Sequence, residues 1–493
     1  MLNITRALVL LACLQFLVPA ALAQDTVRPS VVKVHTTKRL PHPFQPWTKQ
    51  APQNVTGSGV VIDGERILTN AHVVSFSREI YVQGYQSADR VEAKVIAIAP
   101  GMDLAIIEPA DKAFFKDRPP LPLAEGLPKL KETVNAYGYP TGGQELSVTE
   151  GIISRIEIAA YRLNTVGLRI QVDAALNPGN SGGPAIVDKK IVGIVFSGIP
   201  SADNIGYLIP ADEIRTFLED VKDGKYHGKP NLFAGLHSAE NPALRDMLKL
   251  DAATTGIIVT NPQEKESPLQ KWDVITHIGE HAIDNEGRVA VRDDLRLRFE
   301  FFVPKLAKEG KLELSLFRKG EKLKVQVPVK PERDWLVPSL ENDYPRYFIY
   351  GPLVFTCVTQ EFVGAAGGRV QQALGRLDSP LATRIGAVRE FEGEELVSIA
   401  APMFSHKITK GLDNPVLGVI ADVNGVKIKN LRHLVQTLRD SKDEFIVFAF
   451  ADSRPSVLTF KRTEILAATE DILTDNGIRE PYSKDLRDAW EKE

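Results

Sequence analysis

Residues 177–184 read NPGNSGGP, and this short segment decides which fold and which chemistry the rest of the chain has to support. Its serine, Ser181, lies among glycines, which have no Cβ and let the backbone turn sharply. The N–H groups of Gly179 and Ser181, with Asn180 between them, could then converge on a developing oxyanion, where one donor is worth roughly 3 kcal/mol. The alternative is a plain flexible loop, since the G-x-x-x-x-G-K-[ST] phosphate-binding pattern is absent.

Two upstream segments supply possible partners for this serine. Residues 68–74 (LTNAHVV) place His72 in a turn after a strand, and residues 101–107 (GMDLAII) place Asp103 directly before a buried strand. A serine hydroxyl is a weak nucleophile until a base takes its proton, and a neutral imidazole does this near pH 7. A buried carboxylate fixes the tautomer of that imidazole. Alone, the histidine would be read as structural and the aspartate as a turn residue; together with Ser181 they predict a catalytic triad.

The order of these residues along the chain separates two classes of hydrolase. The spacing Gly179-x-Ser181-x-Gly183 also fits the nucleophile elbow of α/β-hydrolases, in which the serine comes first, on a parallel sheet. Here His72 and Asp103 precede the serine, within a helix-poor region (30–210) of short strands separated by Gly and Pro. This is the order of chymotrypsin-like double barrels, so an acyl hydrolase of lipids or esters is disfavoured.

A helix is expected to close the barrel region. Pro210 stands at its start, Asp212 and Glu213 lie in its first turn, and Gly224 ends it. Its apolar face has the spacing i, i+3, i+4, i+7 and comprises Ile214, Phe217, Leu218 and Val221. The polar stretch 223–230 (DGKYHGKP) is then predicted to be a linker.

Two smaller modules are predicted after the linker. The first has strands at 256–259 and 274–278, a helical stretch near 293–307, and a hairpin of 312–317 and 323–329. The order of strand, turn, helix and strand pair recurs within 419–460, which suggests a diverged internal duplication. Residues 361–390 are rich in Gly and Ala and fit no element clearly, and residues 464–493 are charged with two short amphipathic stretches.

Taken together, these segments resemble the Deg/HtrA family of serine proteases over nearly the whole mature chain. The protease motifs are 57–62 (GSGVVI), 68–74 (LTNAHVV), 103–105 (DLA), 138–140 (GYP), 148–154 (VTEGIIS), 171–184 (QVDAALNPGNSGGP) and 204–210 (NIGYLIP). The tail resembles plant-type Deg proteases with an extra, degenerate PDZ domain, through 346–355 (RYFIYGPLVF), 424–434 (NGVKIKNLRHL), 443–450 (DEFIVFAF) and 471–473 (DIL).

The resemblance implies a mainly β chain, with a chymotrypsin-like double β-barrel protease domain followed by two PDZ-like α+β domains. The implied parts are a signal peptide at 1–23, a trypsin-like serine protease domain at 24–228, PDZ domain 1 at 229–330, a degenerate PDZ-like domain 2 with linker at 331–465, and a C-terminal tail at 466–493. The family's triad falls on His72, Asp103 and Ser181, and its oxyanion hole on Gly179, Asn180 and Ser181.

The first PDZ-like domain carries the expected peptide-binding residues. Gly235 and Leu236 lie in 233–236 (FAGL), which corresponds to the family's loop that grips a peptide C-terminus. In this mode an extended peptide adds a strand beside a sheet edge. Trp272 stands where the family has Gly before Asp-Val-Ile. No clear carboxylate loop precedes the second PDZ-like domain, so packing or assembly is its expected role.

The family also implies a trimeric building block, in which PDZ occupancy rearranges loops around the active site. In the Pro-rich loop 38–54, Phe44 and Trp47 could pack on a neighbouring subunit or locally. Residues 194–199 (IVFSGI) are expected to wall the pocket for the residue before the cut bond, and their apolar character favours small aliphatic side chains.

Residues 1–23 (MLNITRALVLLACLQFLVPAALA) have the pattern of a secretory signal peptide. An apolar run follows a positive residue, and Ala21-Leu22-Ala23 is an A-x-A cleavage signal. The run is short for ~30 Å of hydrocarbon and Pro19 interrupts it, which disfavours a membrane anchor. Cleavage after Ala23 leaves Cys357 as the single thiol. An exported chain without disulfides suggests the periplasm, or otherwise a secreted protein.

Composition excludes several function classes. The 493 residues carry 60 Lys+Arg against 63 Asp+Glu, a net charge of -3, whereas a dedicated nucleic-acid binder needs a basic excess. The two cysteines, Cys13 and Cys357, are too few for a disulfide scaffold or a cysteine zinc site. The sequence has no nucleotide or metal motif and no later segment of membrane-spanning length, so neither a cofactor, a metal nor a membrane span is expected.

These observations predict an ATP-independent serine endopeptidase of exported protein quality control. It would cleave misfolded or damaged proteins through an acyl-enzyme, with PDZ domains capturing peptide C-termini or regulating activity. The expected partners are such substrates and copies of the chain itself, as a homotrimer or a multiple of trimers. The alternative is a non-proteolytic peptide-binding chaperone or scaffold, against which the complete set of His72, Asp103 and Ser181 speaks.

Overall fold

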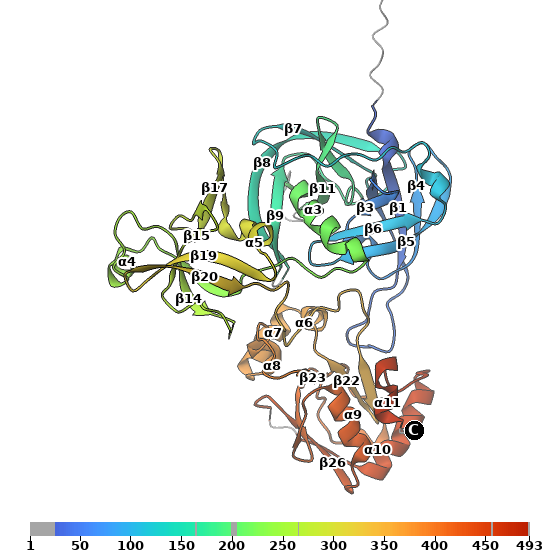
Figure 1. The fold of residues 1–493 in the computed structure, drawn as a ribbon. Helices are drawn as coiled ribbons and strands as arrows, with labels where there is room; N and C mark the ends of the chain where they lie inside the picture. The colour runs from blue at the N-terminus through green and yellow to red at the C-terminus, as the bar shows by residue number, and fades with distance from the viewer. Residues whose placement is uncertain (1–24, 163–164, 199–204, 265, 455–456, 492–493) are drawn as a thin grey trace, which may run out of the picture.

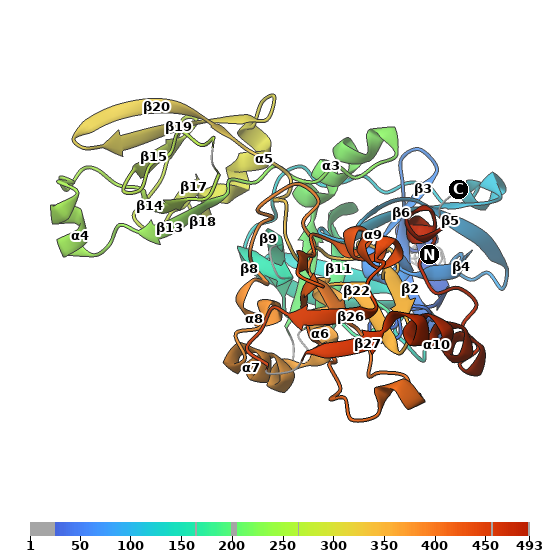
Figure 2. The same ribbon diagram turned by 90° about the horizontal axis from the view of Figure 1, so that it is seen from below.

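The computed structural model describes residues 25–162, 165–198, 205–264, 266–454 and 457–491, and it has three parts (Figure 1). The barrel domain (residues 25–228) contains two β-barrels. The middle domain (229–330) projects from the side of the barrels, and the C-terminal domain (331–491) lies below them in Figure 1. Figure 2 shows the same projection of the middle domain from a second direction. The predicted signal peptide, 1–23, lies outside the described residues.

The barrel domain confirms the predicted double barrel. The first barrel closes in the order β1-β2-β3-β6-β5-β4, and the second in the order β10-β11-β12-β9-β8-β7. The first comprises β1 (Val31–Lys38), β2 (Gln53–Ile62), β3 (Arg66–Thr69), β4 (Ser77–Gln83), β5 (Arg90–Ala99) and β6 (Leu104–Pro109). The second comprises β7 (Thr133–Gly138), β8 (Ser147–Arg162), β9 (Thr165–Val172), β10 (Pro184–Val187), β11 (Lys190–Gly198) and β12 (Gly206–Pro210).

Short helices complete the barrel domain. The one-turn helix α2 (Ala71–Val74) follows β3, and α3 (Ala211–Asp220) follows β12. As predicted, α3 starts after Pro210, carries acidic residues in its first turn, and buries Ile214 and Phe217 in the core between the barrels. Gly224 ends the helical segment in the left-handed conformation, with φ +85°. Three 3-10 turns are also present: η1 (Arg28–Ser30), η2 (Lys112–Phe115) and η3 (Val221–Asp223).

The middle domain is built on an antiparallel sheet. Its strands follow the order β13-β14-β15-β19-β20, with β16 also paired to β15. The elements are β13 (Ala234–Ser238), α4 (Pro242–Met247), β14 (Ile257–Pro262), β15 (Val274–Ile278), β16 (His281–Ala282), β17 (Arg288–Arg292), β18 (Leu295–Arg298), η4 (Phe299–Phe302), α5 (Val303–Leu306), β19 (Lys311–Arg318) and β20 (Glu321–Pro328).

The helix predicted near 293–307 is wrong in its first part. Residues 295–298 form strand β18, which pairs with β17, and helical structure starts at Phe299. Leu295 and Leu297 are buried, whereas the two arginines that alternate with them are exposed. A period of two is the period of a strand, because successive side chains point to opposite faces.

The C-terminal domain has two sheets and a set of helices. One sheet has the order β21-β22-β23, and the other β25-β24-β26-β27. The elements are β21 (Tyr347–Tyr350), β22 (Leu353–Cys357), α6 (Gln360–Ala366), α7 (Gly368–Arg376), α8 (Pro380–Thr383), β23 (Val397–Ile399), η5 (Lys407–Thr409), β24 (Ile420–Val423), β25 (Val426–Lys427), α9 (Leu431–Asp440), β26 (Phe445–Phe450), β27 (Leu458–Lys461), α10 (Arg462–Asp475), η6 (Lys484–Leu486) and α11 (Arg487–Trp490).

The C-terminal domain has three features that the sequence left open or placed differently: the helices of 361–390, the strand order and the C-terminal boundary. The stretch 361–390 folds as the short helices α6, α7 and α8. The order β25-β24-β26-β27 repeats the order β16-β15-β19-β20 of the middle domain, as the suspected duplication requires. The boundary predicted at residue 465 falls inside α10, and residues beyond it are buried in the same cores as the sheets.

The loop 39–52, between β1 and β2 of the barrel domain, packs against the C-terminal domain. Figure 1 shows this loop in blue, reaching down from the barrels. The ring of Phe44 lies 5.6 Å from that of Phe362, and the ring of Trp47 lies 5.5 Å from that of Phe404. Phe44 and Trp47 therefore pack within their own chain, which is the second of the two arrangements predicted from the sequence.

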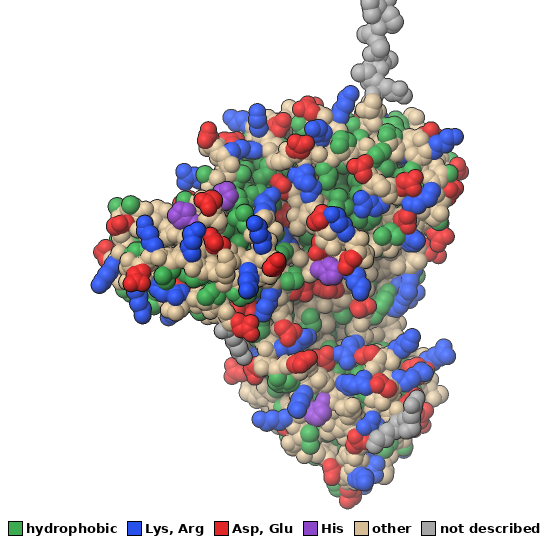
Figure 3. All heavy atoms as spheres, in the orientation of Figure 1, with side chains coloured by type: hydrophobic (Ala, Val, Ile, Leu, Met, Phe, Trp, Pro, Cys, Tyr) green, Lys and Arg blue, Asp and Glu red, His purple; other side chains and the backbone are tan. Residues whose placement is uncertain are grey.

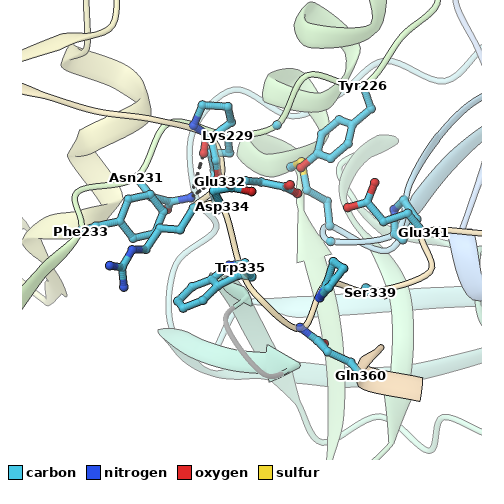
Figure 4. Close-up of a pocket in the computed structure, with 18 of the residues that line it drawn as sticks. Tyr226, Lys229, Asn231, Phe233, Glu332, Asp334, Trp335, Ser339, Glu341 and Gln360 are labelled. Atoms are coloured by element: carbon cyan, nitrogen blue, oxygen red, sulfur yellow. Dashed lines mark hydrogen bonds between the residues drawn. The ribbon is translucent and has the colours of Figure 1, made fainter. Parts of the chain in front are cut away.

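A cavity of about 230 Å³ lies where the barrel domain meets the first residues of the C-terminal domain, 331–343, which we call the linker after β20. Figure 4 shows Tyr226 entering it from the barrel domain, and Glu332 and Glu341 from the linker. On the face seen in Figure 3, acidic and basic side chains are interspersed, in keeping with the small net charge. Within the described ranges, no helix is long and apolar enough to cross a membrane.

Candidate active site

The structure brings His72 and Asp103 together at the ends of two neighbouring strands. His72 lies in α2, directly after β3, and Asp103 directly precedes β6; these strands pair with Thr69 opposite Ala105. The carboxylate of Asp103 accepts hydrogen bonds from Nδ1 of His72 (2.7 Å) and from its backbone N–H (2.7 Å). Because Nδ1 is engaged in this way, Nε2 is the ring atom left to accept a proton.

Burial divides the roles of the pair. The side chain of Asp103 is 0% exposed and that of His72 is 37% exposed. Asp103 has a φ of +58°, a left-handed conformation that costs a non-glycine residue roughly 1–2 kcal/mol. The amide of Asn70 donates to its carbonyl at 2.9 Å and helps to hold that conformation. A fixed, dry carboxylate thus orients an imidazole that solvent and substrate can reach.

Ser181 and the same imidazole both contact Phe196. The Oγ of Ser181 donates to the carbonyl of Phe196 at 3.1 Å, and the ring of Phe196 packs edge-on to that of His72, with centroids 6.4 Å apart. Among the residues that the structure describes, no hydrogen bond joins Ser181 Oγ to His72 Nε2. The hydroxyl has to rotate away from Phe196 before the imidazole can take its proton.

The glycine segment before Ser181 forms a tight turn with a defined peptide orientation. The N–H of Asn180 donates to the carbonyl of Asn177 (3.0 Å), and Gly179 has a φ of +99°. Pro at the second position and a positive φ at the third are features of a type II turn. The carbonyl of Pro178 accepts from the N–H of Thr141 at 2.7 Å.

This orientation leaves two donors open. In a trans peptide the N–H and C=O point in opposite directions, so the N–H of Gly179 points away from Thr141. In the described part of the chain, neither this N–H nor that of Ser181 has an acceptor. The N–H of Asn180, by contrast, is used inside the turn. An added Cβ on Gly179 would lie 2.4 Å from the carbonyl oxygen of Tyr139, so the turn requires glycine here.

Ser58, a residue that the sequence analysis did not single out, holds this turn from the first barrel. Its Oγ donates to the carbonyl of Gly179 and accepts from the N–H of Tyr139, both at 2.8 Å. Its own N–H donates to the carbonyl of Ser181 at 2.8 Å, and its carbonyl accepts from Thr69 Oγ1 at 2.7 Å. Ser58 is fully buried, and its place in the motif GSGVVI was the signal that could have identified it.

Lys38 is a second residue missed from sequence. It lies at the end of β1 and is buried, and its ammonium donates to the backbone carbonyl of His72. Burial lowers the pKa of Lys38, and the charge of Asp103 partly opposes that shift. The site therefore has a buried lysine bonded to the backbone of its histidine.

The predicted pocket segment, residues 194–199, is described in part. Ile194 and Val195 are buried in the cores of the barrel domain, so these two side chains pack inward. Phe196 contributes its carbonyl to Ser181 and its ring to His72. The side chains of the remaining three residues lie outside the described part.

The predicted peptide-binding residues of the middle domain lie in β13, at the edge of its sheet. Gly235 pairs with Asn261 and Leu236 with Val259, across a β-bulge, and Leu236 packs partly buried against the domain core. Within the described ranges, the other edge of β13 has no partner strand and could accept an extended peptide.

Trp272 has a backbone conformation that favours glycine. It has a φ of +78° and is 40% exposed, and its N–H donates to the carbonyl of Val259 at 2.7 Å. Glycine adopts this conformation without steric cost.

No cluster of three or more His, Cys, Asp or Glu that could hold a metal is found among the described residues.

Comparison with known proteins gives a family match for the barrel domain and another for the C-terminal domain. Residues 57–194 match the trypsin-like peptidase domain family, and residues 337–485 match the PDZ domain family. The chain is 36% identical over 439 residues to Protease Do-like 4, mitochondrial, of Arabidopsis thaliana, covering 87% of this chain and 80% of the relative. It is 33% identical over 482 residues to Protease Do-like 2, chloroplastic, of the same plant, covering 96% and 77%. Among solved structures, the HtrA-type protease AlgW with tripeptide is 25% identical, with a TM-score of 0.49, over 62% of this chain and 94% of that one.

Proposed function

Because the chain belongs to the Do-like serine proteases, the Deg/HtrA family, we propose that it is an ATP-independent endopeptidase that degrades misfolded or damaged exported proteins. The observation that carries the proposal is the buried Asp103 carboxylate, whose two oxygens both bond to His72 beside Ser181. The open N–H groups of Gly179 and Ser181 add an anion site at the same place.

In the proposed reaction, Ser181 Oγ attacks the scissile carbonyl carbon while His72 Nε2 takes its proton. Asp103 keeps Nδ1 protonated and stabilises the imidazolium that forms. The N–H groups of Gly179 and Ser181 donate to the oxyanion. The imidazolium then protonates the leaving amine, and water hydrolyses the acyl-enzyme by the same relay. Both steps use groups of this chain and water alone, so no nucleotide enters.

Substrate capture is proposed for the middle domain. An extended C-terminus would pair with the open edge of β13, and the backbone around Gly235 and Leu236 would hold its carboxylate. Capture at this edge would raise the local concentration of unfolded chains near Ser181, and could shift the Gly179 turn between open and closed oxyanion geometries.

Assembly and location are proposed from the sequence and from the family. We expect a homotrimer or a multiple of trimers, and export to the periplasm, or secretion, after cleavage behind Ala23. Native mass spectrometry and N-terminal sequencing of the exported protein test both points. The expected mature N-terminus is Gln24.

The test of the activity compares wild type with Ser181→Ala on casein and on an unfolded client. We expect serine-dependent cleavage, and labelling of Ser181 by a fluorophosphonate in wild type. Equal digestion by both proteins, or labelling of another residue, would remove Ser181 from the proposed role. If Ser181→Ala cleaves nothing but still suppresses client aggregation, a chaperone activity exists beside proteolysis. If wild type suppresses aggregation without cleaving, the alternative of a peptide-binding chaperone holds.

A further inference from the structure

The helix that carries His72 cannot hold its own position. Helix α2 is a single turn of four residues, and a helix this short needs tertiary contacts to persist. Two features of the chain flank His72. On one side, Lys38 donates to its backbone carbonyl. On the other side, the chain passes through Phe76, whose φ of +57° is left-handed and therefore unfavourable for a phenylalanine.

The segment that leads into the C-terminal domain fixes the turn at Phe76. The N–H of Phe76 donates to the side-chain carbonyl of Asn342. The ring of Phe76 packs edge-on to that of Tyr344, with centroids 5.7 Å apart. The carbonyl of Phe76 accepts from the N–H of Arg39 at 3.0 Å. A left-handed phenylalanine persists where its surroundings over-determine its conformation, and these three contacts do so.

Tyr344 also holds the other flank of the histidine helix. Its hydroxyl donates to the carbonyl of Arg39 at 2.7 Å, and Arg39 directly follows Lys38. The ammonium of Lys49 lies 3.8 Å from the centroid of the Tyr344 ring, and the guanidinium of Arg78 lies 5.6 Å from it. Both are cation–π distances, so the ring is held by the loop 39–52 and by β4 together.

The same loop is anchored in the C-terminal domain by its aromatic residues. Phe44 packs on Phe362 and Trp47 on Phe404, and all four belong to or pack against one hydrophobic core of that domain. The loop therefore transmits the position of the C-terminal domain to Arg39 and Lys38. Figure 1 shows the loop and the linker running side by side between the two domains.

We propose that Asn342 and Tyr344 form a clamp that positions His72, so that the C-terminal domain takes part in catalysis by holding the histidine helix. This inference rests on the proposed catalytic role of His72. The clamp touches neither substrate nor the reacting atoms, so its residues are positioning residues. Displacement of a catalytic group by about 1 Å can cost 10²-fold in rate, and its effect falls on turnover.

The experiment measures kcat and KM separately on a short fluorogenic peptide with an amidated C-terminus. Without a free carboxylate, this substrate does not report capture by a PDZ domain. The variants are Tyr344→Phe and the double change Asn342→Ala with Tyr344→Ala, each with a melting temperature. The matched control is Tyr347→Phe, because the Tyr347 hydroxyl donates to the carbonyl of Glu480 at 3.2 Å, inside the C-terminal domain.

For the double variant we expect a fall in kcat of about tenfold or more, with KM within about twofold of wild type. Fluorophosphonate labelling of Ser181 should slow in parallel. Tyr344→Phe, which keeps the ring but loses the hydrogen bond to Arg39, should lower kcat measurably but by less than the double variant, and Tyr347→Phe should match wild type. Wild-type kcat in a folded double variant, a loss confined to KM, or an equal loss in Tyr347→Phe would overturn the clamp.

Two further outcomes are also decisive. If the double variant does not fold, Tyr344→Phe carries the test, and a kcat identical to wild type together with unchanged labelling would count against the clamp. If wild type shows no turnover beyond that of Ser181→Ala, the proposed function fails, and the clamp fails with it. The two failures differ, because the clamp alone fails when wild type and double variant turn over equally well.

Discussion

At the scale of single residues, Ser58 is bonded to the turn at Gly179 that we propose as the oxyanion site. Its hydroxyl joins the carbonyl of Gly179 to the N–H of Tyr139, and its N–H holds the carbonyl of Ser181. Replacing Ser58 by alanine removes the hydroxyl and leaves the buried carbonyl of Gly179 and the N–H of Tyr139 without their partner. The turn can then relax toward geometries in which the N–H of Gly179 no longer faces the reacting carbonyl.

We expect Ser58→Ala to lower kcat by roughly 10²-fold, the size of effect seen when one oxyanion donor is lost, with little change in KM. A peptide boronate, which mimics the tetrahedral state, should bind more weakly by a similar factor. Ser30→Ala is the control, because Ser30 is also fully buried but donates to Pro119, away from the site. Equal losses in the two variants would reduce Ser58 to a general packing role.

At the scale of elements, α10 and the residues after it are part of the C-terminal core. Five large side chains beyond the predicted boundary are buried there: Ile472, Leu473, Ile478, Tyr482 and Leu486. Burying each contributes about 1.5–3 kcal/mol, so together they are comparable with the whole stability of a typical domain. The segment predicted from the sequence to be a C-terminal tail, 466–493, therefore contributes to the core of this domain.

A chain ending at Lys461 should lose the cooperative melting of the C-terminal domain and become sensitive to proteolysis between residues 340 and 461. Circular dichroism and limited proteolysis measure this directly. The control is a chain ending at Glu491, which keeps every buried residue named above and should melt like wild type. A truncated chain that melts like the control would show that the sheets are stable without α10.

At the scale of the whole molecule, Glu341 in the cavity between the domains leads us to expect that their packing depends on pH. Burial, followed by the nearby charge of Glu332, raises the pKa of Glu341 to about 6. Basic groups also line the cavity, including Arg169, Lys229 and Arg389. Because the folded protein holds this proton more tightly than the unfolded chain, the associated stability is present at low pH and is lost as the pH rises through about 6.

Hydrogen exchange of the linker 331–343 should therefore be slower at pH 5 than at pH 7, once the intrinsic effect of pH is removed. Glu341→Gln, which mimics the protonated form, should remove the part of this difference that comes from the carboxyl. Glu341 is exposed to solvent, so a modest effect is expected. The same pH dependence in wild type and Glu341→Gln would assign it to other groups.

Much of the fold could be predicted because local patterns carry it. The hairpin predicted for 312–317 and 323–329 is present as β19 and β20, with Leu312 opposite Val327. The spacing of Ile214 and Phe217 predicts the buried face of α3. The prediction near 293–307 is wrong for the same kind of reason, because Leu295 and Leu297 alternate with exposed arginines at the period of a strand.

The sequence by itself determined the double barrel, which the structure confirms, and it led to the proposal of His72, Asp103 and Ser181 as a triad, because motifs and their order can be read along the chain. Tertiary structure alone decided what holds them: Ser58 and Thr141 on the oxyanion turn, and Lys38, Asn342 and Tyr344 around the histidine helix. The physical reason is that these are hydrogen bonds and ring contacts between segments far apart in the chain. No periodicity encodes such pairs, and they form only when the barrels close and the C-terminal domain docks.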